Sequence, residues 1–252
     1  MRVFGISAVV LLSIVDLGWS QVDVSSSQAA NLPLYRPVLL GTGPDALINR
    51  IDTAGLIKQG QKDAAIMFSC SVKKTGEVLS VSTYRGTPDS KLLEQELLKK
   101  ISAAANPKFI PAIYNHLPVD AIYYGTVIFA IVDDKPRLRI FSNQEREELK
   151  KENDFIGPQP FYGADSKFSG FHYPSRESAP VPVDGSTELE LKVDASGNLQ
   201  DLKVLSEQPP FLGFGNAALD DLSKARFIPA FREGKPVACD VKVPVYYKAK
   251  GF

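Results

Sequence analysis

An internal repeat constrains the fold of this 252-residue chain more than any other feature of its sequence. Residues 108–112 read Lys-Phe-Ile-Pro-Ala, and residues 226–230 read Arg-Phe-Ile-Pro-Ala. Upstream of these motifs, Gly76 and Gly197 stand in similar turn-forming segments. The two glycines are 121 residues apart, and the phenylalanines of the two motifs are 118 residues apart. Because the landmarks recur in the same order, the sequence predicts two copies of one folding unit.

The second copy has the pattern of a β-hairpin followed by a helix and a further strand. Leu189, Leu191 and Val193 alternate with charged residues, which indicates a half-buried strand. Gly197 supplies the positive φ that a tight turn after this strand needs. The other predicted elements are a returning strand over 199–205, a short helix over 216–225 and a last strand over 237–245.

The first copy shows the same order of elements. The predicted strands lie over 64–73, 77–84 and 121–132, and a helix between the last two begins at Thr87-Pro88. The buried stripe of this helix is predicted from helical spacing to be Leu93, Leu97, Ile101 and Ala104. Outside the repeat, the pattern predicts a helix over 44–59, a strand over 137–141, a charged helix over 144–153 and a linker over 154–172.

The first 20 residues are predicted to be an export signal. Arg2 precedes an apolar stretch, from Phe4 to Val15, that is short for a membrane-spanning helix. Gly18 and Ser20 place small residues at the −3 and −1 positions of a cleavage site. An N-terminal core helix is the alternative. With the signal removed, the sequence predicts a periplasmic or secreted protein without a membrane span.

Charge and residue counts restrict the classes of function. Lys and Arg number 29 and Asp and Glu number 29, so the formal net charge is zero. A nucleic-acid partner is not expected, because surfaces that bind phosphates usually show a basic excess. His116 and His172 are the only histidines, and their spacing is not typical of a metal or catalytic site. No catalytic residue, metal ligand or cofactor is therefore assigned.

Two further groups of residues are predicted to be structural. Cys70 and Cys239 fall on inward-facing positions of strands in different copies, where buried thiols are expected. A disulfide is the alternative, and it requires the two Cα atoms to lie within about 7 Å of each other. A solvated helix face, rather than an acid–base pair, is predicted for Glu145, Glu147, Glu148 and Glu152.

The second copy resembles the C-terminal domain of TonB-family proteins over residues 172–248. The motifs that carry the resemblance are Tyr173-Pro174, Val193-Asp-Ala-Ser-Gly197, Arg226-Phe-Ile-Pro-Ala230, Gly234-Lys-Pro-Val237 and Val241-Lys-Val-Pro244-Val245. The first copy resembles the same domain more weakly, and His116 stands where the glycine of the Gly-Lys-Pro turn would be. The resemblance implies an α+β fold of two tandem β-β-α-β domains, each a small antiparallel sheet with a helix packed on one face.

On this basis the chain divides into five segments. They are a signal peptide (1–20), an N-terminal extension (21–43), a divergent first TonB-C-like domain (44–141), a helical segment and linker (142–171), and a second TonB-C-like domain (172–252).

The resemblance also implies a function. In the family, the last strand lies at a sheet edge and pairs with an extended peptide from an outer-membrane receptor. The expectation is therefore an exported, non-enzymatic binding module that recognises an extended peptide of an envelope or outer-membrane protein. Because the chain has no long Pro-rich spacer, the resemblance implies recognition rather than force transduction. A link to transport is left open. The alternatives are a structural or self-associating envelope protein, such as a homodimer, and an enzyme with a pocket between the copies.

By resemblance, the peptide-binding residues are Asp240, Lys242, Val243, Pro244, Val245, Tyr246 and Tyr247. Proline is tolerated in this strand only if its missing N–H would face away from the sheet. Lys242 and Tyr246 share the parity of Pro244, so their backbone groups are then expected to point outward to a ligand. The side chains of Tyr246 and Tyr247 either contact the ligand or pack as ordinary strand residues.

The corresponding strand of the first copy is expected to be closed. Thr126 stands where the second copy has Pro244, and residues 123–132 are apolar on both faces. We expect the strand over 137–141 to pair along this edge. The first copy would then serve as a scaffold, while the second keeps its edge open.

Overall fold

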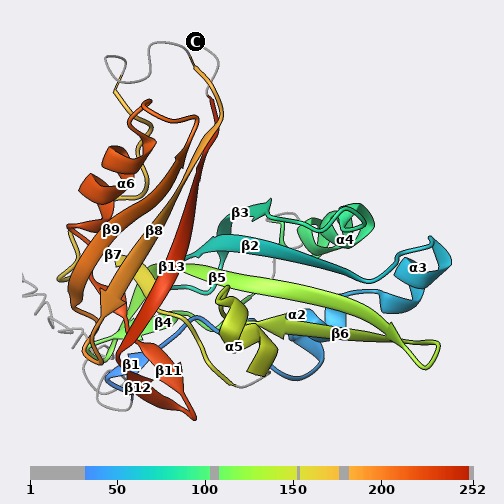
Figure 1. Cartoon of the computed structure of the whole chain (residues 1–252). Coiled ribbons are helices and arrows are strands. Elements are labelled where there is room, and N and C mark those ends of the chain that lie inside the picture. The colour runs from blue at the N-terminus through green and yellow to red at the C-terminus, as the bar shows by residue number, and fades with distance from the viewer. Residues whose placement is uncertain (1–31, 103–107, 152–153, 176–181, 250–252) are drawn as a thin grey trace, which may run out of the picture.

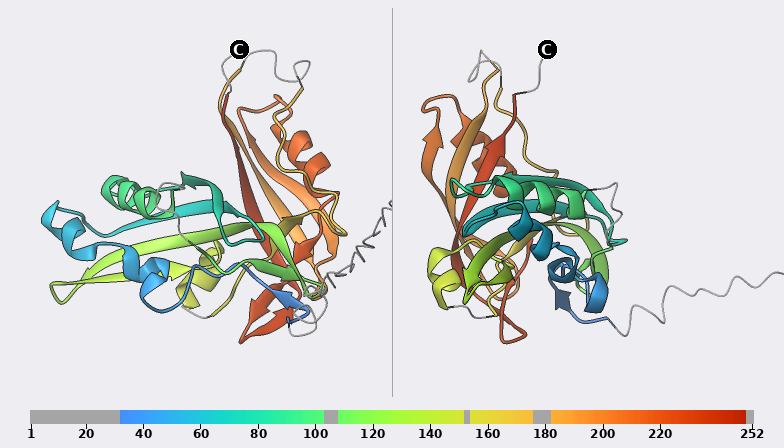
Figure 2. Two further views of the ribbon diagram at one scale, coloured as in Figure 1. Left: turned by 180° about the vertical axis from the view of Figure 1, so that it is seen from behind. Right: turned by 90° about the vertical axis from the view of Figure 1, so that its right-hand side faces the viewer.

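The computed structural model describes residues 32–102, 108–151, 154–175 and 182–249. The expected export signal and Ala104 of the helical stripe lie outside these residues. The chain is a mixed α+β protein, as predicted, with two main antiparallel sheets that extend in different directions and meet at one end (Figures 1 and 2). In the described ranges, no helix combines the length and the apolar character that a membrane span requires.

The first sheet is built on the strand order β3-β2-β5-β6. The predicted strands are present as β2 (Ala64–Val72), β3 (Val78–Tyr84), β5 (Leu117–Val132) and β6 (Lys135–Phe141). Every second side chain of β2 is buried, which is the period that a half-buried strand requires. Three short strands extend this sheet at the N-terminal end of β5: β1 (Tyr35–Arg36), β4 (Ala112–Tyr114) and β7 (Gln159–Tyr162).

The helix of the first copy begins later than predicted. Helix α4 (Lys91–Ile101) buries Leu93, Leu97 and Ile101 as expected. The Thr87 N–H, however, donates to the Ala65 carbonyl oxygen (2.9 Å), and the Ala65 N–H donates to Thr87 Oγ1 (3.1 Å). Thr87 therefore bonds to the edge of β2 and does not cap the helix.

The single helix predicted over 44–59 is wrong. The segment forms η1 (Gly43–Asp45), α2 (Leu47–Arg50) and α3 (Thr53–Lys58). Ile51 is buried in an extended conformation between α2 and α3. Asp52 then caps α3, because its side chain accepts a hydrogen bond from the Gly55 N–H (2.8 Å).

The second sheet has the strand order β13-β8-β9. Its strands are β8 (Gly185–Val193), β9 (Leu199–Gln208) and β13 (Cys239–Tyr247). Helix α6 (Phe214–Leu222) packs on the sheet and buries Phe214, Ala218 and Leu222. The path from α6 to β13 passes through β10 (Phe227–Ile228), β11 (Ala230–Arg232) and β12 (Lys235–Val237).

The segments that the sequence repeat aligns pair in one register. In the first sheet, the β2–β5 pairs run from Ala64↔Phe129 to Val72↔Ala121. In the second sheet, the β8–β13 pairs run from Gly185↔Tyr247 to Val193↔Cys239. Each β8 residue lies 121 positions after its counterpart in β2, and each β13 residue lies 118 positions after its counterpart in β5. These numbers equal the spacings of the repeated glycine and phenylalanine.

The repeated glycine and phenylalanine contact each other in both sheets. The Phe109 N–H donates to the Gly76 carbonyl oxygen (2.9 Å), and the Phe227 N–H donates to the Gly197 carbonyl oxygen (3.0 Å). The φ angles of the two glycines are +84° and +77°. A Cβ atom on Gly197 would lie 1.8 Å from the Phe227 carbonyl oxygen. Both the backbone conformation and this close approach therefore require glycine.

The outer edges of β5 and β13 differ. Strand β6 pairs with the second half of β5, from Thr126↔Phe141 to Val132↔Lys135, so the predicted pairing of 137–141 with 123–132 is confirmed. Strand β13 ends the order β13-β8-β9, and within the described part of the chain no strand pairs with its outer side. The first sheet thus pairs this edge with a further strand, whereas the second, over the described residues, does not.

The segment 142–171, expected to be a helical segment and linker, contributes β7 to the junction of the two sheets. Strand β7 pairs with β5 through Ala121↔Phe161 and with β10 through Ile228↔Gln159. Ile228 packs in the core of the first sheet, while Ile122 of β5 packs in the core of the second. The sheets are therefore joined by hydrogen bonds and by shared core residues, rather than by a free linker.

Neither cysteine forms a disulfide. Cys70 is fully buried in the core of the first sheet, as predicted. Cys239 is partly buried against the core of the second sheet, and burial raises the pKa of its thiol to about 12.

The close approach at Gly197 predicts a large loss of stability on substitution. Gly197→Ala should lower the free energy of unfolding by about 3 kcal/mol or more, because it combines a strained φ with a clash against Phe227. Gly234→Ala is the matched control. Gly234 has a similar φ of +73° but open space around a new Cβ, so we expect a loss of about 1 kcal/mol. Urea denaturation of both variants measures the difference, and equal losses would contradict this account.

Candidate functional site

The backbone of β13 presents hydrogen-bonding groups on two sides. The Lys242 N–H points away from β8 and donates to Glu145 Oε1 (2.5 Å). Because inward and outward backbone groups alternate along an antiparallel strand, Pro244 and Tyr246 share the outward orientation of Lys242. The missing N–H of Pro244 therefore removes no bond to β8, as the sequence analysis required.

The seven predicted site residues divide into those with exposed and those with buried side chains. Asp240, Lys242 and Tyr246 are exposed. The side chains of Val243, Val245 and Tyr247 are buried in the core of the second sheet, and Pro244 is also buried. The centroids of the Tyr247 and Phe214 rings are 5.2 Å apart. Tyr247 therefore packs as an ordinary strand residue, which is one of the two predicted alternatives.

Residues at the end of β3 contact side chains of the second sheet. The Tyr84 ring stacks on the Tyr246 ring with centroids 4.5 Å apart. The Arg85 guanidinium lies 3.0 Å from the Glu188 carboxylate on β8. No local sequence pattern indicates Tyr84 or Arg85 as site residues, because these contacts depend on how the two sheets meet.

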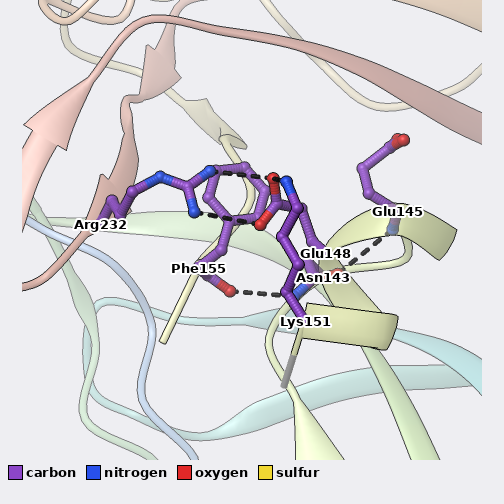
Figure 3. A network of polar contacts seen from close by, with 6 residues as sticks. All are labelled: Asn143, Glu145, Glu148, Lys151, Phe155 and Arg232. Carbon is purple, nitrogen blue, oxygen red and sulfur yellow. Dashed lines mark hydrogen bonds and ion pairs between the residues drawn. The ribbon is translucent and has the colours of Figure 1, made fainter. Parts of the chain in front are cut away.

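The segment after β6 is anchored to the first sheet. The Thr126 hydroxyl donates to the Asn143 carbonyl oxygen (2.9 Å), and the Asn143 amide donates to the Phe155 carbonyl oxygen (2.9 Å; Figure 3). The next residue, Gln144, donates from its side-chain amide to the Tyr84 hydroxyl (2.6 Å). These bonds fix the start of helix α5 (Arg146–Lys151) beside β13 (Figure 1).

Two glutamates of this segment bind residues of β13 and β11. Glu145 accepts from Lys242, and Glu148 forms a two-bond contact with the Arg232 guanidinium (2.9 and 3.1 Å; Figure 3). The guanidinium carbon also lies 4.9 Å from the centre of the Phe155 ring. The prediction of a wholly solvated glutamate face is therefore wrong for Glu145 and Glu148. Glu147 is exposed as predicted, and Glu152 lies outside the described residues.

A crevice of about 440 Å³ lies between the outer side of β13 and the first sheet. Its charged lining carries three basic and three acidic side chains: Arg85, Arg146, Lys242, Glu145, Glu147 and Glu188. Lys242 and Pro244 of β13 and Glu188 of β8 contribute to its lining. A polar crevice beside an edge strand suits a ligand that offers backbone hydrogen-bonding groups.

The two histidines lie away from this crevice. His172 Nδ1 is 2.8 Å from Asp221 Oδ1, and the His172 N–H donates to Asp221 Oδ2 (2.7 Å), beside a second cavity of about 420 Å³. His116 has a φ of +63° in the turn between β4 and β5. Its counterpart in the second copy, Gly234, has a φ of +73°. The two turns therefore have a similar backbone conformation, although one has histidine where the other has glycine.

Burial raises the pKa of the Glu145 carboxyl, although the Lys242 N–H and the charge of Lys242 act in the opposite direction. A raised pKa in the folded chain means that the charged form is disfavoured by folding. The stability this group contributes is therefore present below its unfolded pKa near 4.5 and is lost as the pH rises through the folded value.

Replacement of the carboxyl by an amide should remove this pH dependence. Glu145→Gln keeps an oxygen acceptor for the Lys242 N–H but carries no charge. We expect the free energy of unfolding of the variant, relative to the original chain, to rise between about pH 4 and about pH 7. Denaturation curves at several pH values measure this difference. A difference that falls with pH would contradict the assigned direction of the shift.

Comparison with known proteins supports the resemblance of the second copy. A search among curated proteins finds no match for the chain. Residues 170–249 match the family described as the Gram-negative bacterial TonB protein C-terminal, and this match contains β8, β9, α6 and β13.

Proposed function

We propose that the chain is an envelope binding protein that captures an extended peptide as an added strand on the outer edge of β13. The observation that carries the proposal is the Lys242 N–H, which faces outward and already bonds an oxygen acceptor from outside the sheet. Asp240 and Tyr246 share its parity. A peptide strand would satisfy these outward backbone groups, and Pro244 would offer its carbonyl oxygen alone.

We further propose that the chain contains two tandem copies of the TonB-C-like unit and that the two copies have different roles. It is supported by the common register of the β2–β5 and β8–β13 pairs and by the repeated Gly–Phe contact. In the first copy, β6 occupies the edge that a peptide would need. The first copy is then a scaffold, and the second is the binding unit.

The family match also supports a place in the cell envelope. We propose that the mature chain is periplasmic after removal of residues 1–20, and that its partner is a segment of an envelope or outer-membrane protein. A role in receptor-linked transport follows only if that partner is a receptor. Self-association through sheet edges, which would make the chain a structural protein, is the competing outcome.

Photo-crosslinking in the native envelope tests the proposed function. A photoreactive residue in place of Lys242 should form adducts with a segment of another envelope protein. The matched control carries the photoreactive residue at Lys203, an exposed position on β9 at the opposite edge of the same sheet, and should not give these adducts. Adducts only between copies of the chain would favour self-association, and the absence of adducts would contradict peptide capture.

Removal of one outward donor should weaken capture without loss of the sheet. Asp240→Pro removes an outward N–H that does not bond to β8, at a position with the same parity as Pro244. With the photoreactive residue kept at position 242, we expect the adduct yield to fall by about tenfold, the effect of one lost hydrogen bond. Circular dichroism should remain unchanged. An undiminished yield would show that the β13 backbone does not hold the peptide.

A further inference from the structure

The outward donor of β13 is not free, because a segment of the same chain already occupies it. Residues 143–151, here called the strap, run from the end of the first sheet through α5 and lie beside β13 (Figure 1). The strap places Glu145 Oε1 on the Lys242 N–H, where a peptide carbonyl oxygen would bind. One N–H cannot fully bond both acceptors, so peptide and strap compete.

We propose that the strap is an intrachain cover of the β13 edge, and that a peptide binds by displacing it. This inference rests on the proposed function and concerns the regulation of the same site. Its consequence is that the resting chain captures peptide weakly, since the bound state is reached only when Glu145 leaves Lys242.

The strap is anchored at its start and has few buried contacts beside β13, as expected of a segment that can be displaced. Its first two residues, Asn143 and Gln144, are bonded to the first sheet and hold one end, and the chain is held again beyond the strap, where the Ile156 N–H donates to the Phe231 carbonyl oxygen (2.9 Å). Helix α5 has no buried residue. Beyond Gln144, the Glu145 carboxylate accepts from Lys242 of β13, and the Glu148 carboxylate pairs with Arg232 of β11 (Figure 3). A segment with few buried contacts can open locally without unfolding the rest.

Separation of the two sheets is not a comparable way to expose the edge of β13. Strands β7 and β10 pair across the junction, and Ile228 and Phe231 pack in the core of the first sheet. Separation of the sheets would break this pairing and expose both side chains to water. Movement of the strap exposes the edge of β13 at a far smaller cost in buried apolar area.

The strap is tested by two measurements on the same variants. Glu145→Ala removes the acceptor, and Glu148→Ala releases the other contact at Arg232. Lys150→Ala is the control, because it removes an exposed charged side chain of α5 that pairs with Glu147 and does not line the crevice. Amide hydrogen exchange at Lys242 is measured by NMR in the purified chain, and photo-adduct yield from position 242 is measured in the envelope.

We expect the Lys242 amide to exchange about tenfold faster in Glu145→Ala, and the adduct yield to rise by a similar factor. Glu148→Ala should change both in the same direction, and Lys150→Ala should change neither. Unchanged exchange at Lys242 would overturn the strap. Adducts of equal yield with and without Glu145 would also overturn it while leaving peptide capture intact. Faster exchange with no adducts in any variant would overturn peptide capture itself, and its regulation with it.

Discussion

The pairing of β7 with both β5 and β10 is the interaction on which the rest of the molecule depends. It inserts the second Phe-Ile motif into the hydrogen-bonded structure of the first sheet, and it carries Ile228 into the first core. Because the two sheets are fixed in this way, Tyr84 and Arg85 contact side chains of β13 and β8, and the strap reaches the outward N–H of Lys242. Without this junction there would be no crevice and no cover.

Strand β13 contributes both to a core and to a sheet edge, because its side chains and its backbone groups alternate in direction along the strand. The side chains of Val241, Val243, Val245 and Tyr247 form the core beneath α6. The backbone groups of the opposite parity face outward, and Pro244 falls in this set, where its missing N–H costs the sheet nothing. The same strand can therefore hold the second sheet and its core together and still present an edge. The first sheet has lost this second purpose, since β6 pairs along β5.

Much of the fold could be predicted from the sequence because it depends on local periodicity. The alternation in β2, the apolar stripe of α4 and the turn at Gly197 each reflect contacts within one sheet. The cover by β6 could also be predicted, because a strand apolar on both faces requires a neighbour. Thr87 was misjudged because its hydrogen bonds go to Ala65 on another element. No local pattern reports such a partner.

The site was predicted only in part, for a related physical reason. The outward parity of Lys242 follows from Pro244, which lies in the same strand. Glu145 and Glu148 belong to a sequence with the charge pattern of a solvated helix, and their partners come from a segment about 90 residues away. Their role depends on the junction made by β7, whose pairing no periodicity within residues 154–172 indicated.

Peptide capture at the outer edge of β13 is tested most directly by amide chemical-shift mapping. The partner segment recovered from the Lys242 photo-adduct is synthesised and added to the isotope-labelled chain. The account predicts that the largest shifts fall on the outward amides of Asp240, Lys242 and Tyr246 and on the strap. Largest shifts on β9, or around His172 and α6, with the β13 amides unchanged, would contradict it.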